Sequence, residues 1–169
     1  MEYKNFFHNC SEHYLCYFFN VKKIENTEIH KAIHDLRYLG PNAKQSEYNL
    51  ELKKSFNSEK WNEEEKISND THIRMTADFS KNFDGKQIYL EVQFGKTEAL
   101  IRDICKMQIA FSEKLLTLGV IIVPYEPRHM FALRKQSISG MAYLEMGIKT
   151  LQHLPFNFPI WMIGLNPKS

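Results

Sequence analysis

Cysteine, glycine and proline are all scarce in this chain of 169 residues. The three cysteines, Cys10, Cys16 and Cys105, cannot all be paired in a disulfide framework, so a reducing, cytoplasmic environment is expected. With 7 glycines and 6 prolines, collagen-like and low-complexity classes are excluded. No apolar run approaches the roughly 20 residues that span a bilayer, and the first residues lack a secretory signal layout. We therefore expect an intracellular protein without a membrane partner.

An excess of charge of one sign is also absent, because 22 basic residues face 20 acidic ones. The charge is nevertheless unevenly distributed. Residues 1–84 carry 12 basic and 14 acidic side chains, a net of −2, whereas residues 85–169 carry 10 and 6, a net of +4. Residues 127–142 contain Arg128, Arg134 and Lys135 and no acid. An anionic ligand is expected to meet the C-terminal half.

The length and a hydrophobic content of 43% predict a single domain over residues 1–169 with a substantial core. Apolar residues recur at helical spacing in residues 24–39 and again at Tyr48, Leu52 and Phe56, so residues 1–70 are expected to form a helical N-terminal part. Within it, the polar residues 57–70 are interpreted as a solvated face or loop. Residues 71–169 are expected to form the core that carries the function.

Two strands are predicted by strict alternation of apolar and polar residues in residues 71–79 and 87–94. Asp84-Gly85 between them is a strong signal for a two-residue hairpin turn. This turn sets a register in which paired residue numbers sum to 169. Asp78 then faces Glu91 and Thr76 faces Gln93 on a polar face, while the opposite face is apolar and pairs Met75 with Phe94, Ala77 with Val92 and Phe79 with Leu90.

A strand–helix–strand unit is predicted after the hairpin. Thr97 is a suitable N-cap for a helix that Gly119 ends, and residues 120–123 are short, apolar and β-branched, as in a buried central strand closed by Pro124. A further helix over residues 141–153 precedes another apolar segment, residues 159–165. The fold class is therefore expected to be α/β, with a mixed β-sheet flanked by helices.

The pairing of Asp78 with Glu91 is the feature with the clearest chemical content. Two carboxylates a few ångströms apart form a natural site for Mg²⁺, a hard cation that takes oxygen ligands and activates water near a phosphate. The alternative is that both are solvent-facing strand residues that repel each other mildly. The pattern alone does not decide between a metal site and a solvated strand face.

Residues 88–96, Ile-Tyr-Leu-Glu-Val-Gln-Phe-Gly-Lys, resemble the catalytic strand of the BglII/BstYI family of type II restriction endonucleases. That family belongs to the PD-(D/E)xK nucleases and has Gln where most of them have Lys. The similarity continues through Lys106-Met107, Ala110-Phe111, residues 118–124 and 139–145, and Ile163-Gly164-Leu165. It covers about half of the chain, mainly the C-terminal half, and it implies a restriction-endonuclease-like core.

This resemblance implies that Asp78 and Glu91 bind Mg²⁺ and that Gln93 is the third catalytic residue. Asp78-Phe79 is the pair that matches the family, but the hairpin is about four residues longer here, which makes Asp84 a rival for the metal. The predicted register favours Asp78, because Asp84 at the turn tip points away from Glu91. The reaction implied is hydrolysis of a DNA phosphodiester by an activated water that the amide of Gln93 positions.

For DNA recognition, the resemblance points to Lys96, Ser139 and Gly140 as groups that read bases. The alternative for Ser139-Gly140 is a helix cap and loop. Arg128, Arg134 and Lys135 are expected to contact phosphates. Relatives that cut palindromes with a GATC core imply a homodimer, a GATC-containing site and a host methyltransferase as functional partner.

The sequence thus favours a Mg²⁺-dependent, site-specific deoxyribonuclease of the restriction type. Two alternatives stay open: a catalytically weak relative that binds DNA, and a structural or interaction protein with an acidic surface hairpin. The spacing of His8, Cys10, His13 and Cys16 suggests zinc, but the interleaved aromatic residues favour a packed helix. His30 and His34 stand four residues apart and are expected on an exposed helix face rather than on a metal.

Overall fold

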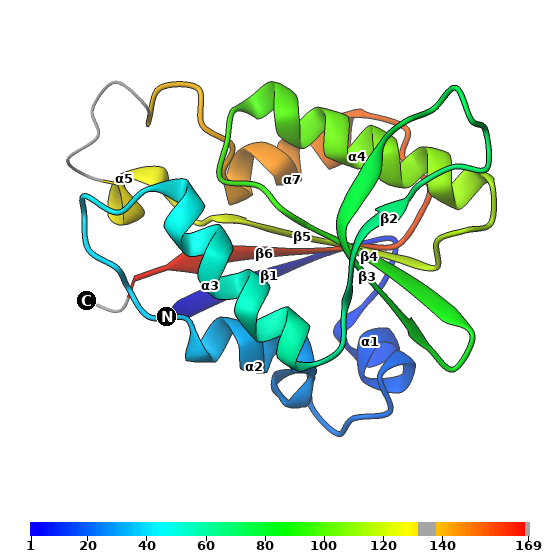
Figure 1. The fold of residues 1–169 in the computed structure, drawn as a ribbon, viewed down its shortest axis with the longest axis horizontal. Coiled ribbons are helices and arrows are strands. Elements are labelled where there is room, and N and C mark those ends of the chain that lie inside the picture. The colour runs from blue at the N-terminus through cyan, green and yellow to red at the C-terminus, as the bar shows by residue number, and fades with distance from the viewer. Residues whose placement is uncertain (132–137, 168–169) are drawn as a thin grey trace.

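A six-stranded mixed sheet with helices on both faces forms the fold in the computed structural model, which describes residues 1–131 and 138–167 (Figure 1). The strand order is β1-β6-β5-β4-β3-β2. The strands are β1 (Glu2–His8), β2 (Asn62–Lys66), β3 (Thr76–Phe83), β4 (Lys86–Val92), β5 (Leu118–Pro124) and β6 (Ile160–Asn166). The helices are α1 (Glu12–Phe18), α2 (Glu28–Asp35), α3 (Gln45–Ser58), α4 (Thr97–Ser112), α5 (Pro127–Met130) and α7 (Leu144–His153), with a short 3₁₀ turn at Ile24–Asn26. The predicted fold class is confirmed.

The centre of the sheet is parallel: β4 pairs with β5, and β5 pairs with β6. Helix α4 makes the crossover between β4 and β5, as the predicted strand–helix–strand unit requires. Every residue of β5 is buried, which confirms the central strand. No helix within the described residues is both long and apolar enough to cross a membrane.

Helix α4 differs from its predicted bounds at both ends. It ends at Ser112 rather than Gly119 because Lys114 adopts a left-handed conformation with φ of 60° and the N–H of Leu115 returns to the carbonyl of Ala110 at 2.9 Å. This is the bonding pattern of a Schellman C-cap. At the other end Lys96 is the N-cap residue, while the Thr97 hydroxyl donates to the Gly140 carbonyl at 3.1 Å. Thr97 therefore ties two segments together instead of capping the helix.

The two faces of the sheet have separate apolar cores. Helices α1, α2 and α3 cover one face, where Leu52 and Phe56 pack with Leu90 of β4. Helices α4 and α7 cover the other face, where Leu100 and Ile104 pack with Ile121 of β5 (Figure 1). Because β4 lies between these layers, its side chains are buried on both sides, and the predicted half-buried strand is wrong for β4.

The hairpin between β3 and β4 confirms the predicted turn. Asp84 and Gly85 both have positive φ, 49° and 80°, as a type I′ turn demands. The five paired positions run from Phe83 with Lys86 to Phe79 with Leu90, and their numbers sum to 169 in every case. The turn therefore fixed the register of the strands near it.

Residues 1–70 contain the predicted helices but also two strands that the sequence pattern did not indicate. Strand β1 pairs antiparallel with β6 along its whole length, joining Glu2 to Asn166. Strand β2 lies within the polar segment interpreted as a solvated loop, and it forms the opposite edge by pairing with β3. Its Glu and Lys side chains suit an exposed edge, because charge there opposes pairing with other chains. The helical description of residues 1–70 is therefore incomplete.

Candidate active site and DNA-binding cleft

Strands β3 and β4 separate just beyond the pair Phe79–Leu90, and Asp78 lies at the point of separation. The predicted backbone pair of Asp78 with Glu91 does not form in the ladder. Instead, a carboxylate oxygen of Asp78 accepts a hydrogen bond from the backbone N–H of Val92 at 2.9 Å. The Asp78 side chain thus takes the place of a main-chain partner where the strands diverge.

Strand β3 is irregular at this residue. Ala77 packs with the α4 face of the sheet and Phe79 with the α3 face, although residues two apart share a face in a regular strand. The predicted common face for Met75, Ala77 and Phe79 is therefore wrong. On the neighbouring edge, Glu64 has φ of 53° and no partner in the ladder between β2 and β3.

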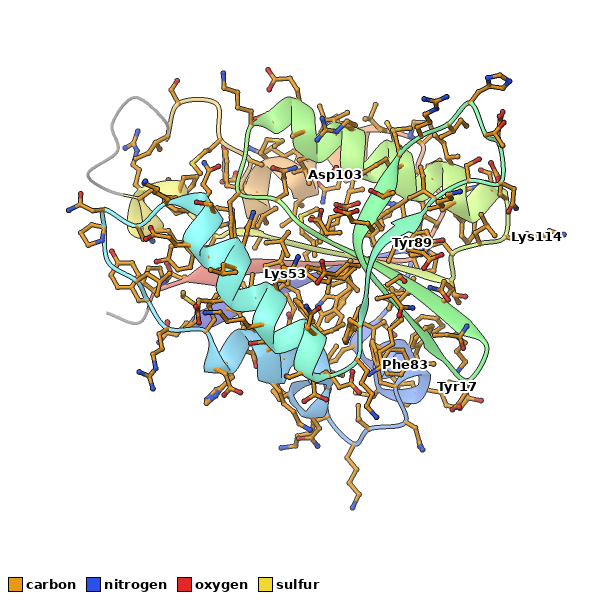
Figure 2. All side chains as sticks on the ribbon, viewed as in Figure 1. Tyr17, Lys53, Phe83, Tyr89, Asp103 and Lys114 are labelled. Atoms are coloured by element: carbon orange, nitrogen blue, oxygen red, sulfur yellow. The ribbon has the colours of Figure 1, made fainter. Side chains whose placement is uncertain are left out.

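A small cavity of about 180 Å³ lies beside Asp78 on the side of helix α3. Asn49 and Lys53 of α3 line it together with Asp78 and Val92. Lys53 is held by an ion pair with Glu63 at 2.5 Å. Figure 2 shows Lys53 on α3 and Asp103 on α4, on the two sides of the sheet. The neighbourhood of Asp78 therefore contains polar groups from α3 that the sequence analysis did not include.

Glu91 and Gln93 point to the α4 face and are buried, with exposed fractions of 2% and 9%. The alternative of a solvent-facing strand residue is therefore wrong for Glu91, because α4 covers it and Gln93. Lys106 of α4 reaches this point: its ammonium lies 2.6 Å from Glu91 Oε1 and 3.1 Å from Asp103 Oδ1, and it donates to the Thr76 carbonyl at 3.0 Å. Apart from this ion pair, Glu91 Oε1 has no hydrogen-bond partner among the described residues.

Gln93 is fixed at both ends of its amide. Its Nε2 donates to Asp103 Oδ2 at 2.5 Å, and its Oε1 accepts from the N–H of Gly95 at 2.7 Å. A Cβ atom at Gly95 would lie 2.6 Å from Gln93 Oε1, so only glycine permits this approach. At most one N–H of the amide is left for another acceptor, such as a water.

The electrostatics of this cluster favour a cation. The pKa of Glu91 is raised to about 9, mainly by burial and then by the carboxylates of Asp78 and Asp103, against the opposing effect of Lys106. Burial acts to lower the pKa of Lys106, but Glu91 and Asp103 outweigh burial and raise it. One ammonium is thus surrounded by more negative charge than it neutralises.

The oxygen ligands of Asp78 and Glu91 fit a magnesium ion, which proteins commonly hold by one or two carboxylates while substrate phosphate and water complete its shell. No group of three His, Cys, Asp or Glu suited to a metal occurs in residues 1–131 and 138–167. Asp84 lies at the hairpin tip, where Phe83 pairs with Lys86, about 17 Å along β4 from Glu91 at ~3.4 Å per residue. The arrangement supports Asp78 over Asp84 as the partner of Glu91.

Asp103 and Lys106 are the site residues that sequence reasoning missed. Both are buried polar residues of α4, between Leu100 and Ala110 of its apolar stripe. Charged residues inside an apolar stripe are rarely buried without partners, and this was the available signal.

A cleft of about 750 Å³ lies next to the site, where the chain leaves β4. Lys96 forms a β-bridge with Met141, and the N–H of Ala142 donates to the Gly95 carbonyl at 2.9 Å. Arg128, Ser139 and Gly140 line the cleft and are exposed, as is the adjacent Lys96. The structure thus brings together four of the predicted DNA-binding residues; Arg134 and Lys135 lie outside the described residues.

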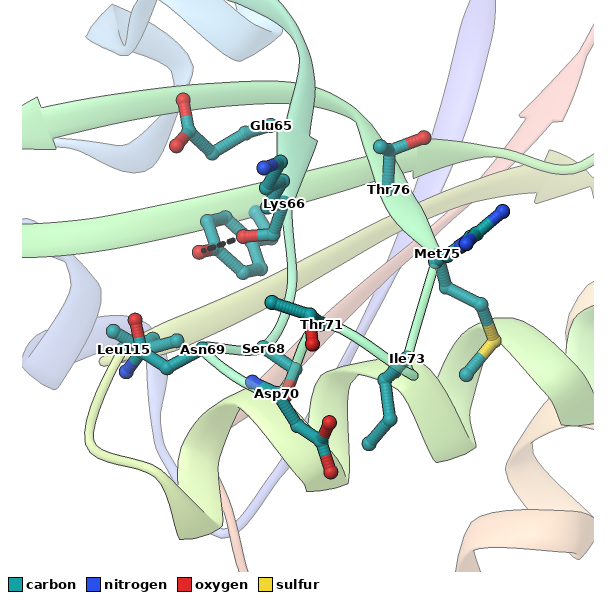
Figure 3. A pocket seen from close by; sticks show the side chains of 12 residues that line it. Glu65, Lys66, Ser68, Asn69, Asp70, Thr71, Ile73, Met75, Thr76 and Leu115 are labelled. Carbon is teal, nitrogen blue, oxygen red and sulfur yellow. Dashed lines mark hydrogen bonds between the residues drawn. The ribbon is translucent and has the colours of Figure 1, made fainter.

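Other features do not join this site. A cavity of about 660 Å³ near the start of β3 contains none of the predicted site residues; there the Tyr89 hydroxyl donates to the Lys66 carbonyl at 3.0 Å (Figure 3). His30 is buried against the rings of Tyr3 and Trp161, while the His34 side chain is 71% exposed. The expected exposed face is therefore wrong for His30.

Comparisons with known proteins agree on one relationship. The family model described as restriction endonuclease BglII/BglIII matches residues 5–165. Among solved structures, the crystal structure of restriction endonuclease BglII complexed with a DNA 16-mer matches with a TM-score of 0.72 at 18% identity, covering 99% of this chain and 79% of that one. A search of curated proteins found no match. At this identity, the structural match shows a shared fold.

Proposed function

Because the chain belongs to the BglII/BglIII restriction endonuclease family, we propose that it is a type II site-specific endonuclease that hydrolyses double-stranded DNA with Mg²⁺. The observation that carries the proposal is the position of two carboxylates on the facing strands β3 and β4. Asp78 lies where the ladder ends, and Glu91 is buried beside it, where the ammonium of Lys106 contacts its Oε1. Burying a carboxylate close to those of Asp78 and Asp103 is costly unless it has a function or a ligand.

In this proposal Asp78 and Glu91 hold the metal ion. When bound, Mg²⁺ supplies positive charge that stabilises the phosphorane-like transition state and lowers the pKa of the attacking water. Val92 N–H fixes the orientation of the Asp78 carboxylate. Gln93 is neutral and cannot act as an effective base, so its remaining amide N–H would orient the water.

The cleft beside the site would receive the DNA. Lys96 can donate to guanine O6 or N7, and the Ser139 hydroxyl and the exposed main chain at Gly140, with φ of 74°, can reach base edges. Arg128, together with Arg134 and Lys135, would contact phosphates. A two-fold homodimer reading a short palindrome, with GATC at its core, follows from the proposed family mechanism, as do a cytoplasmic location and a host methyltransferase that protects the same site.

The test is a cleavage assay on unmethylated and GATC-methylated phage DNA, with Mg²⁺ and with EDTA. Discrete fragments that require Mg²⁺ and unmethylated DNA are expected, and their ends would identify the site. The variant E91Q should still bind the mapped site in a gel shift but leave it uncut. Cleavage by E91Q at the wild-type rate would refute the assignment of Glu91.

A catalytically weak DNA-binding relative is the second candidate. It is favoured by the ion pair of Lys106 with Glu91 and by the double engagement of the Gln93 amide, since both occupy groups that catalysis would need. Intact DNA under all conditions, together with a salt-sensitive gel shift, would select this candidate.

A further inference from the structure

Lys106 and Asp103 form a buried ion pair in direct contact with the proposed metal site. The side chains of Asp103 and Glu91 are each 3% exposed, and that of Lys106 is 10% exposed. A buried ion pair seldom adds stability, because desolvation offsets the attraction. Packing alone does not account for an ammonium held between two carboxylates beneath a catalytic strand.

The balance of charge around Lys106 is unequal. Asp78, Glu91 and Asp103 together carry three negative charges when ionised, as metal binding requires, and Lys106 supplies one positive charge. The remainder of two negative charges equals the charge of one divalent cation. Glu91, Asp103 and Lys106 are mostly removed from water, so their charges act on a nearby ion more strongly than charges at an exposed surface would, whereas Asp78 is exposed.

We propose that the Asp103–Lys106 pair sets the affinity of the Asp78–Glu91 site for its divalent cation. Lys106 opposes the cation because its ammonium contacts Glu91 directly. Asp103 favours the cation because its carboxylate binds Lys106 from the other side and adds negative charge. Neither residue touches the reacting atoms: Lys106 acts through Glu91, and Asp103 acts through Lys106 and through the negative charge that it adds. This inference rests on the proposed function of the site.

The two partners are therefore expected to shift cation affinity in opposite directions. The variant D103N is isosteric and removes a negative charge, so the site should bind Ca²⁺ about tenfold or more weakly. The variant K106M keeps the chain length and removes a positive charge, so the site should bind Ca²⁺ about tenfold or more tightly. If the ion pair served only the stability of the fold, both variants would change cation affinity in the same direction, because either substitution breaks the pair.

Ca²⁺ is the probe because affinity can then be measured apart from cleavage. The Ca²⁺ concentration that half-saturates the gain in DNA affinity is measured at pH 8.5 by fluorescence anisotropy, on a duplex carrying the site that wild-type cleavage maps. Half-saturation of cleavage by Mg²⁺ is the second readout. K106R keeps the charge and is expected to restore a value near that of the wild type.

Matched controls make the same kinds of substitution at exposed positions away from the site, so that the effect of the charge near Glu91 can be distinguished from a general effect of the substitution. K114M changes an exposed lysine just beyond α4, and D35N changes an exposed aspartate at the end of α2; both should leave cation affinity unchanged. Thermal melting in EDTA checks that each variant is folded. If K106M does not fold, K106Q removes the same positive charge and takes its place in the comparison with D103N.

The outcomes distinguish this inference from the function on which it rests. If wild-type protein shows neither a Ca²⁺-dependent gain in DNA affinity nor Mg²⁺-dependent cleavage, the proposed function fails. If wild-type protein shows both, but D103N and K106M shift cation affinity in the same direction or not at all, the proposed function stands and the role of the pair is overturned.

Discussion

Glu91 should make the metal-free protein less stable as the pH rises. Its pKa is about 9 in the folded protein against 4.5 ordinarily, so the folded state binds more protons than the unfolded state between these values. Stability therefore falls as the pH rises from 4.5 to 9. E91Q removes the titrating group and keeps its shape, so it should be more stable than the wild type in EDTA.

The size of the effect follows from the pKa shift. At about 1.4 kcal/mol per pH unit, three units between 4.5 and 7.5 give an upper bound of about 4 kcal/mol at pH 7.5, and one unit gives about 1 kcal/mol at pH 5.5. Relaxation of the buried site reduces the first figure to about 2 kcal/mol. In a domain of this size, that corresponds to a melting temperature about 4–8 °C higher for E91Q.

Circular dichroism melts of both proteins in EDTA at pH 5.5 and 7.5 measure the difference. The variant E98Q, which removes an exposed carboxylate from α4, should follow the wild type at both pH values. The prediction is refuted if the difference in melting temperature between E91Q and wild type does not increase with pH, or if E91Q melts at a lower temperature than wild type at pH 7.5. Either result would show that burying the charge of Glu91 does not destabilise the protein.

Three other outcomes are expected. D78N should reduce Mg²⁺-dependent cleavage by at least about a thousandfold, because the site would lose a proposed metal ligand. D84N should stay within about threefold of wild type, because Asn suits the hairpin turn equally well, and single-turnover cleavage rates measure both effects. K96A and S139A should each weaken binding to the mapped site by about 1–3 kcal/mol and leave binding to a scrambled duplex nearly unchanged, as anisotropy titrations would show, and an equal loss on both duplexes would place these residues on phosphates. F56A should lower the free energy of unfolding by about 3–5 kcal/mol in urea titrations, because Phe56 is fully buried between α3 and the sheet; a cost below 1 kcal/mol would contradict its place in the core.

The sequence predicted those parts of the fold that depend on local patterns. Asp84-Gly85 set the hairpin register, and the apolar run before Pro124 indicated the central strand, because both signals lie within a few residues. Strand β1 could not be predicted in this way, since it pairs with β6, at the other end of the chain. Pairing across such a separation leaves no periodic signal of its own.

In the candidate site, too, local sequence patterns predicted some features and not others. The positions of Asp78 and Glu91 near one another followed from the hairpin register, but their surroundings did not. Ala77 and Phe79, on the two sides of Asp78, pack on opposite faces of the sheet where the pairing of β3 with β2 is irregular. Glu91 is buried because α4 crosses above it. Lys106 becomes a partner of Glu91 only through that crossing.

Gly95 connects the proposed catalytic residue Gln93 to the cleft through the main chain of a single residue. Its N–H holds the amide of Gln93, and its carbonyl accepts the N–H of Ala142 beside the cleft. If an incorrect base pair displaced the residues of the cleft, the movement would therefore be transmitted to Gln93 through the main chain of Gly95, without an intervening side chain. We expect fidelity to be expressed in the speed of the chemical step as well as in affinity, so that incorrect sequences are held but cut slowly.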